Sequence, residues 1–288
     1  MALTSADRKL ANRLVVGLRG PGLDHDEAAW LEAYQPAGVI LFGRNVLRYD
    51  QLADLCSRLR MILGPEAELV ADHEGGPVSV LVSAIGRPPS AAALGCLDDV
   101  DLTQRVHRDT AELMVGVGFN RVLSPCCDVL LEPRNAVIGA RSFGSDGDRV
   151  ARHVAAAIRG LVAGGLRCCP KHWPGHGGTV RDTHLDGVDR AVERDDSLYV
   201  CAVSAGADTV MVGHLPLGDD GPPASLDPAA RDILGGRLPD VEIWSDDITM
   251  AAIRPVLADR SGDSPAGEGM VDPGDYPLSW LHEAGRHN

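Results

Sequence analysis

Short apolar runs alternate with longer amphipathic segments along most of this chain. An apolar run without polar alternation, such as 37–43, is typical of a parallel strand covered on both faces. The pattern predicts strands at 13–20, 37–43, 67–71, 121–129, 166–170, 207–214 and 241–250. It predicts helices at 26–34, 50–63, 101–117, 148–163 and 191–206, with a further helix capped near Ser225 or Asp227.

The repeated order of strand and helix predicts an α/β fold, a TIM-type (β/α) barrel that forms a single domain over 1–288. An eighth strand is not evident, because 258–276 is rich in Gly, Pro, Asp and Ser and 278–285 favours a short helix. We therefore expect a barrel that is incomplete or irregular at the eighth strand, with an irregular segment from about 258. An open sheet edge is costly to expose, so we also expect a homo-oligomer.

Polar, glycine-rich loops follow several predicted strands, at the end where barrels bind their ligands. The longest runs from Lys171 to His184 and contains three histidines. Lys171 is one of only two lysines in the chain, which reflects either a need for a compact ammonium at this position or chance. Asp182 stands two residues before His184, so its carboxylate could orient the imidazole for acid/base chemistry, although an isolated pair of this kind is usually solvated.

Other loops offer further candidates for a site. Asp72 and Glu74 flank a histidine before a glycine pair, a pattern that suits a metal site, a hydroxyl-binding loop or a charged turn. His214 ends the strand at 207–214 and is either a site residue or a packed core histidine. Asp246 follows the last strong strand, where an aspartate serves as a nucleophile or as a helix cap.

The loop at 171–184 resembles the signature of family 3 glycoside hydrolases, and in particular their bacterial β-N-acetylglucosaminidase branch. The likeness rests on the phrase from Lys171 to Gly177 and on the Asp182–His184 pair, and it extends over roughly 10–252. Similar phrases surround Asp72, Arg141 and Asp246. Departures from the family pattern are Thr183, Gly178 and Pro77, the last in place of an arginine.

The resemblance implies roles for individual residues. Asp246 would be the nucleophile, and His184, paired with Asp182, the general acid/base. Sugar contacts would come from Asp72, Arg141, Lys171, His172 and His214. Asp128 would be structural. No metal and no organic cofactor is implied.

These roles imply retaining hydrolysis of a β-linked N-acetylglucosamine from a small glycoside or a cell-wall fragment. Alternatives are deglycosylation of an N-acetylglucosaminylated biosynthetic intermediate, transfer to phosphate, and an inactive barrel that only binds sugar.

The composition limits which classes of binding partner are expected. The net charge of −14 argues against nucleic acid and against an anionic membrane surface. No apolar run reaches the roughly 20 residues of a membrane span, and the first residues lack the pattern of a signal peptide. We therefore expect a cytoplasmic protein that acts on a small glycoside. The seven cysteines are read as small buried hydrophobes, although the pairs at 126–127 and 168–169 could hold a metal.

Overall fold

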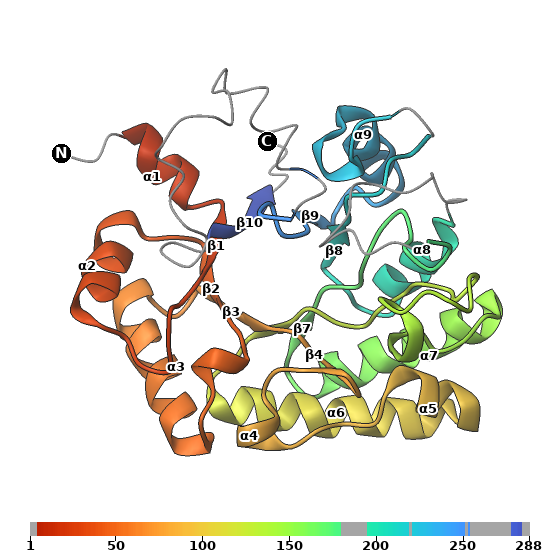
Figure 1. The fold of residues 1–288 in the computed structure, drawn as a ribbon, viewed down its shortest axis with the longest axis horizontal. Helices are drawn as coiled ribbons and strands as arrows, with labels where there is room; N and C mark the ends of the chain where they lie inside the picture. Colours follow the sequence, from red (N-terminus) through yellow and green to blue (C-terminus); the bar gives the residue numbers. More distant parts are fainter. Residues whose placement is uncertain (1–4, 180–194, 219–220, 251–252, 254–277, 284–288) are drawn as a thin grey trace.

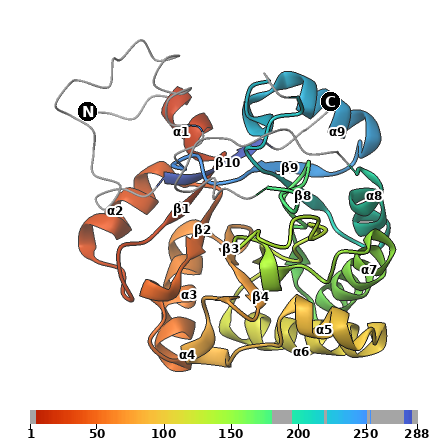
Figure 2. The ribbon, with the colours of Figure 1, turned by 45° about the vertical axis from the view of Figure 1, so that its right-hand side comes forward.

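The strands lie at the centre of the protein and the helices surround them, as Figure 1 and Figure 2 show. The computed structural model describes residues 5–179, 195–218, 221–250, 253 and 278–283. The strands are β1 Leu14–Gly17, β2 Gly38–Leu41, β3 Glu68–Ala71, β4 His73–Gly75, β5 Val78–Ser79, β6 Arg121–Val122, β7 Arg167–Cys168, β8 Thr209–Val212, β9 Glu242–Ser245 and β10 Leu278–Glu283. The helices are α1 Ser5–Ala11, α2 His25–Tyr34, α3 Tyr49–Leu63, α4 Val82–Ile85, α5 Ala91–Leu97, α6 Val100–Val117, α7 Gly147–Ala163, α8 Ser197–Ser204 and α9 Pro228–Arg237. Short 3-10 turns are η1 Gly43–Asn45, η2 Gly139–Arg141 and η3 Ala224–Leu226.

The eight-stranded sheet follows the spatial order β7, β6, β3, β2, β1, β10, β9, β8. Neighbouring strands from β1 to β7 run parallel, and so do β8 and β9. The segment after β7 then pairs with β8, because Trp173 donates its amide to Met211 O at 2.9 Å and Met211 donates to Pro170 O at 3.0 Å. The predicted irregular (β/α) barrel is therefore confirmed.

The eighth position contains a strand where the sequence suggested a short helix. β10 pairs antiparallel with β1, with Val15 opposite Trp280, and antiparallel with β9, with His282 opposite Trp244. The helix expectation was wrong because the unpaired edges of β1 and β9 offer backbone partners that outweigh a weak local preference. Since β10 lies between those two strands, the open edge that motivated self-association is absent, and the oligomeric state stays a prediction.

A layer of apolar side chains fills the barrel interior, contributed by β1, β2, β3, β8 and β9 and by the residues directly after β6 and β7. Its fully or almost fully buried members are Val15, Ile40, Val70, Leu123, Cys169, Met211 and Trp244. A larger core lies between the sheet and the surrounding helices, where α6 and α7 pack closely. A Cβ added to Gly160 of α7 would lie 2.3 Å from Gln104 O of α6, so only glycine fits there. Asp99 and Asp146 cap the two helices by accepting amide hydrogens from Leu102 and Arg149.

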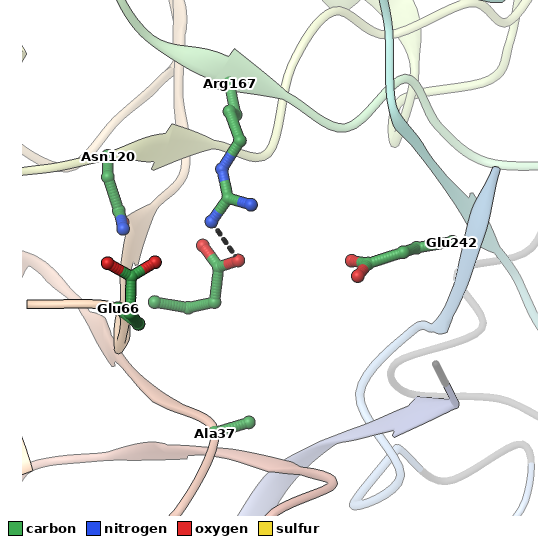
Figure 3. A pocket seen from close by; sticks show the side chains of 6 residues that line it. Ala37, Glu66, Asn120, Arg167 and Glu242 are labelled. Atoms are coloured by element: carbon green, nitrogen blue, oxygen red, sulfur yellow. Dashed lines mark hydrogen bonds and ion pairs between the residues drawn. The ribbon is translucent and has the colours of Figure 1, made fainter. Parts of the chain in front are cut away.

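Charged side chains close the amino-terminal end of the barrel. The Arg121 side chain is fully buried, pairs with Glu68 and Asp208, and lies 4.9 Å from the centre of the Trp244 ring. Figure 3 shows the adjoining pocket, of about 400 Å³, lined by Ala37, Glu66, Glu68, Asn120, Arg167 and Glu242. In barrels of this type catalysis takes place at the opposite end, so we assign these charges to stability.

The sequence located most elements within a few residues. The apolar run at 37–43 contains β2, and the helices predicted at 50–63, 101–117 and 148–163 correspond to α3, α6 and α7. Asp227 is the cap of α9, since its side chain accepts the Ala229 amide hydrogen. The helix predicted at 191–206 is shorter, as α8, and 191–194 lies outside the described residues. No helix in the described part of the chain is long and apolar enough to cross a membrane.

Candidate active site

Lys171 lies at the centre of an ion-pair network at the carboxyl ends of the strands. It follows β7, and its buried ammonium lies 2.5 Å from Asp72 Oδ1 and 2.6 Å from Glu74 Oε1. Asp72 comes directly after β3, and Glu74 lies in β4. Parallel strands end at the same edge of the sheet, which is why residues so far apart in sequence meet here.

Arg141 joins the same network from the η2 turn. Its Nε and Nη2 atoms donate to the two carboxylate oxygens of Glu74 at 2.9 and 2.8 Å. Nη2 also lies 3.1 Å from His172 Nε2. A guanidinium only donates hydrogen bonds, so Nε2 accepts and the ring proton resides on Nδ1.

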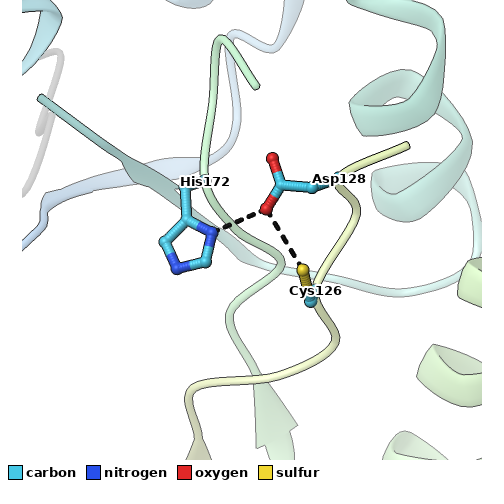
Figure 4. A group of neighbouring side chains, drawn as sticks. All are labelled: Cys126, Asp128 and His172. Atoms are coloured by element: carbon cyan, nitrogen blue, oxygen red, sulfur yellow. Dashed lines mark hydrogen bonds and ion pairs between the residues drawn. The ribbon is translucent and has the colours of Figure 1, made fainter. Parts of the chain in front are cut away.

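That proton is donated to Asp128, as Figure 4 shows. His172 Nδ1 lies 2.7 Å from Asp128 Oδ2, and the Cys126 thiol donates to the same oxygen at 3.1 Å. Asp128 Oδ1 accepts the backbone amide hydrogen of His176 at 2.5 Å. The carboxylate therefore fixes both the His172 ring and the glycine-rich loop, which fits the structural role predicted for it.

Cys126, Asp128 and His172 are also the one group of metal-ligand side chains in the described residues, with ligand atoms within 4.8 Å of one another. Their hydrogen bonds already engage these ligand atoms without a metal. The second cysteine pair, at 168–169, is not part of such a group.

Charge pairing determines the ionisation of this network. Burial alone would raise the pKa of Glu74, but Arg141 and Lys171 outweigh it and lower that pKa. Burial alone would lower the pKa of Lys171, and the carboxylates of Asp72 and Glu74 raise it instead. The pKa of Asp128 is likewise lowered, since its neighbour His172 outweighs the cost of burial. Glu74, Lys171 and Asp128 are therefore charged throughout the neutral range.

Glycines give the loop after β7 its shape. Gly175 has a φ of +137°, which side chains rarely allow. A Cβ added to Gly177 would lie 1.7 Å from Val129 O, so only glycine lets the two backbones approach. Asn135 donates its side-chain amide to His176 O at 2.7 Å. These contacts fix the loop through Thr179, and Asp182 and His184 lie outside the described residues.

Asp246 follows β9 and lies at the same end of the barrel. Its backbone amide donates to Val212 O at 2.8 Å, and its Oδ1 accepts the Asp247 amide hydrogen at 2.8 Å. Burial raises its pKa, but His214, His172 and Lys171 together lower it. Asp247 is the aspartate that caps the following turn, because it accepts the Thr249 amide hydrogen at 2.8 Å.

His214 is buried with both ring nitrogens engaged. Nδ1 lies 2.7 Å from Ser225 Oγ, and Nε2 lies 2.9 Å from the carbonyl oxygen of Asp247. The Ser225 hydroxyl and the Asp247 carbonyl therefore occupy the contacts that a sugar would otherwise receive. This arrangement favours the packed-histidine interpretation, in which His214 fixes the turn after Asp246.

The structure thus joins Asp72, Arg141, Lys171 and His172 into one network and places Asp246 at the same end of the barrel. The sequence interpretation assigned no role to Glu74, which links Lys171 and Arg141. It also did not connect Asp128 and Cys126 with His172. Glu74 stands two residues after Asp72, within the phrase that drew attention to that residue. This position was the signal available in the sequence.

The fold is a (β/α) barrel, and acids, a lysine, an arginine and histidines gather at the carboxyl ends of its strands. This arrangement is typical of barrel enzymes that bind polar substrates. The profile described as glycosyl hydrolase family 3 N terminal domain matches residues 6–261, and the chain belongs to this family. A β-hexosaminidase of Stenotrophomonas maltophilia (strain R551-3) is 34% identical over 255 residues, which are 83% of this chain and 75% of that protein.

Solved structures agree with this relationship. A family 3 β-N-acetylglucosaminidase from Paenibacillus sp. str. FPU-7 superposes with a TM-score of 0.81 at 27% identity, covering 91% of this chain and 54% of that one. The chain thus spans about half the length of the Paenibacillus protein. Native NagZ from Neisseria gonorrhoeae has a TM-score of 0.75 at 26% identity, covering 88% and 85% of the two chains. By these relationships the chain is a glycoside hydrolase of the β-N-acetylhexosaminidase class.

Proposed function

We propose that this protein removes a β-linked N-acetylglucosamine from a small glycoside or a cell-wall fragment with retention of configuration. The observation that carries the proposal is the network of Asp72, Lys171, Arg141 and His172 beside Asp246 at the carboxyl ends of the strands. Carboxylates, an ammonium and a guanidinium offer the acceptors and donors that sugar hydroxyls and an N-acetyl carbonyl require. We expect the protein to be cytoplasmic.

In the first step, the Asp246 carboxylate bonds to the anomeric carbon while the bond to the leaving oxygen breaks. His184, oriented by Asp182, donates a proton to that oxygen. In the second step His184 takes a proton from water, the water oxygen bonds to the anomeric carbon, and the bond to Asp246 breaks. A lowered pKa keeps Asp246 in the ionised form that a nucleophile requires.

One feature bears on the leaving group. Pro77 is exposed on the turn between β4 and β5 and has no side-chain donor, where the family resemblance places an arginine. This difference supports a leaving group other than a cell-wall fragment, such as the remainder of a glycosylated biosynthetic intermediate.

The test compares 4-nitrophenyl N-acetyl-β-glucosaminide with the matching β-glucoside, each with and without phosphate. We expect faster release from the N-acetylated substrate and free N-acetylglucosamine as the product. Equal or reversed rates contradict the N-acetyl assignment, and a sugar 1-phosphate as product identifies a phosphorylase. Sugar binding without release by the wild-type protein identifies an inactive barrel.

A further inference from the structure

Glu74 is the one residue that bonds to both cations of the network in the described residues. Its Oε1 lies 2.6 Å from Lys171 Nζ and 2.8 Å from Arg141 Nη2, and its Oε2 lies 2.9 Å from Arg141 Nε. Its side chain is 4% exposed, whereas that of Asp72, the other partner of Lys171, is 21% exposed. Glu74 is therefore as deeply buried as Lys171, at 4% and 3% exposed, and Asp72 lies nearer to the solvent.

The charges of this network balance. Lys171 and Arg141 contribute two positive charges, and Asp72 and Glu74 contribute two negative charges. This balance holds for those four side chains alone, because Asp128, which is bonded to His172 and the His176 amide, and Asp246 add two further negative charges at this end of the barrel. Without Glu74, Lys171 and Arg141 would have Asp72 as their only anionic partner in this network.

We propose that Glu74 sets the charge preference of the sugar site: it positions Lys171 and Arg141 and neutralises them, so that the site favours uncharged sugars over anionic ones. The inference rests on the proposed function, because both cations must face the sugar. Charges interact strongly in buried surroundings, so one unbalanced cation is enough to change the preference. Glu74 acts through the two cations and is a positioning residue.

The experiment measures dissociation constants by calorimetry for N-acetylglucosamine and for its analogue with a carboxylate at C6. The quantity of interest is the ratio of the two constants. We expect Glu74→Gln to shift this ratio toward the anionic sugar by about tenfold or more, because the side chain keeps its size and loses its charge. Lys171→Gln should shift the ratio in the opposite direction, and Glu74→Asp should retain the preference of the wild type.

The matched control is Glu112→Gln, which neutralises an exposed glutamate on α6. If the ratio of dissociation constants is the same for Glu74→Gln as for this control, the inference is overturned. Loss of a purely structural glutamate would weaken the binding of both sugars alike and leave the ratio unchanged. If Glu74→Gln does not fold, the Lys171→Gln ratio decides, and no shift there overturns the inference as well. Wild-type protein that binds neither sugar overturns the proposed function itself, an outcome distinct from an unchanged ratio.

Discussion

The Nη2 atom of Arg141 lies 3.1 Å from Nε2 of His172, and this contact determines which ring nitrogen carries the proton. Because the guanidinium is a donor only, His172 must present its other nitrogen, as N–H, to Asp128. The ring is therefore held from both sides, and its orientation depends on Asp128 as much as on Arg141.

Asp128→Ala should weaken both folding and catalysis. It leaves the His172 N–H and the His176 amide buried without their acceptor, which costs about 3 kcal/mol of unfolding free energy. Urea denaturation measures the loss, with the exposed Asp109→Ala as the control. Unchanged stability and unchanged kcat/KM would show that the ring is held without Asp128.

Variants of Asp246 and of His184 should lose activity in different ways. Asp246→Asn removes the nucleophile, so turnover should fall by orders of magnitude on every substrate. His184→Ala removes the proton donor, so it should impair substrates with alcohol leaving groups most, while a nitrophenolate still departs and glycosyl-enzyme accumulates.

The measurement is pre-steady-state release from an activated and an unactivated N-acetylglucosaminide. Asp182→Asn should be a milder form of His184→Ala. Equal impairment of both substrates by His184→Ala, including the initial burst, would rule out an acid/base role for His184.

Stability should fall between about pH 6.5 and pH 4 because of two buried histidines. Burial lowers the pKa of His73 to about 4 and that of His107 to about 4. A group with a lowered folded pKa and an unfolded pKa near 6.5 binds its proton mainly in the unfolded chain over this window. Each histidine should therefore remove up to roughly 3 kcal/mol of unfolding free energy as the pH falls.

Urea denaturation of the wild type and of His107→Gln at pH 7 and pH 5 tests this dependence. The variant should lose less stability than the wild type on acidification, because it lacks one of the two titrating groups. Identical losses would mean that His107 does not titrate between the two states.

Arg121→Met should destabilise the barrel while sparing the chemistry. The substitution removes the buried partner of Glu68 and Asp208 and leaves them with Arg167, which is 42% exposed, at a cost of about 3 kcal/mol. Thermal unfolding should show a lower Tm, and KM measured well below that Tm should match the wild type. The exposed Arg108→Met serves as the control. A raised KM at low temperature would connect this end of the barrel with the sugar site.

The sequence by itself determined the barrel and supplied most of the candidate site residues. Helices such as α6 follow from local periodicity, because an amphipathic helix buries one face at intervals of three or four residues, and runs such as 37–43 are recognised by being apolar throughout, since β2 is buried on both faces. Asp72, Lys171 and Asp246 were named because they follow predicted parallel strands, whose ends gather at one edge of the sheet, and because the phrases around them resemble the family's. Asp182 and His184 rest on the sequence pattern alone.

Only the tertiary structure decided the contacts between distant segments. β10 is a strand because β1 and β9 offer it backbone partners, which no local pattern reveals. Glu74 binds Lys171, and Asp128 binds His172, across 97 and 44 positions of sequence, a coupling that depends on the register of β3, β6 and β7. His214 is a second example. The sequence identified it only as a histidine at the end of a strand, and its hydrogen-bond partners Ser225 and Asp247 are set by the tertiary structure.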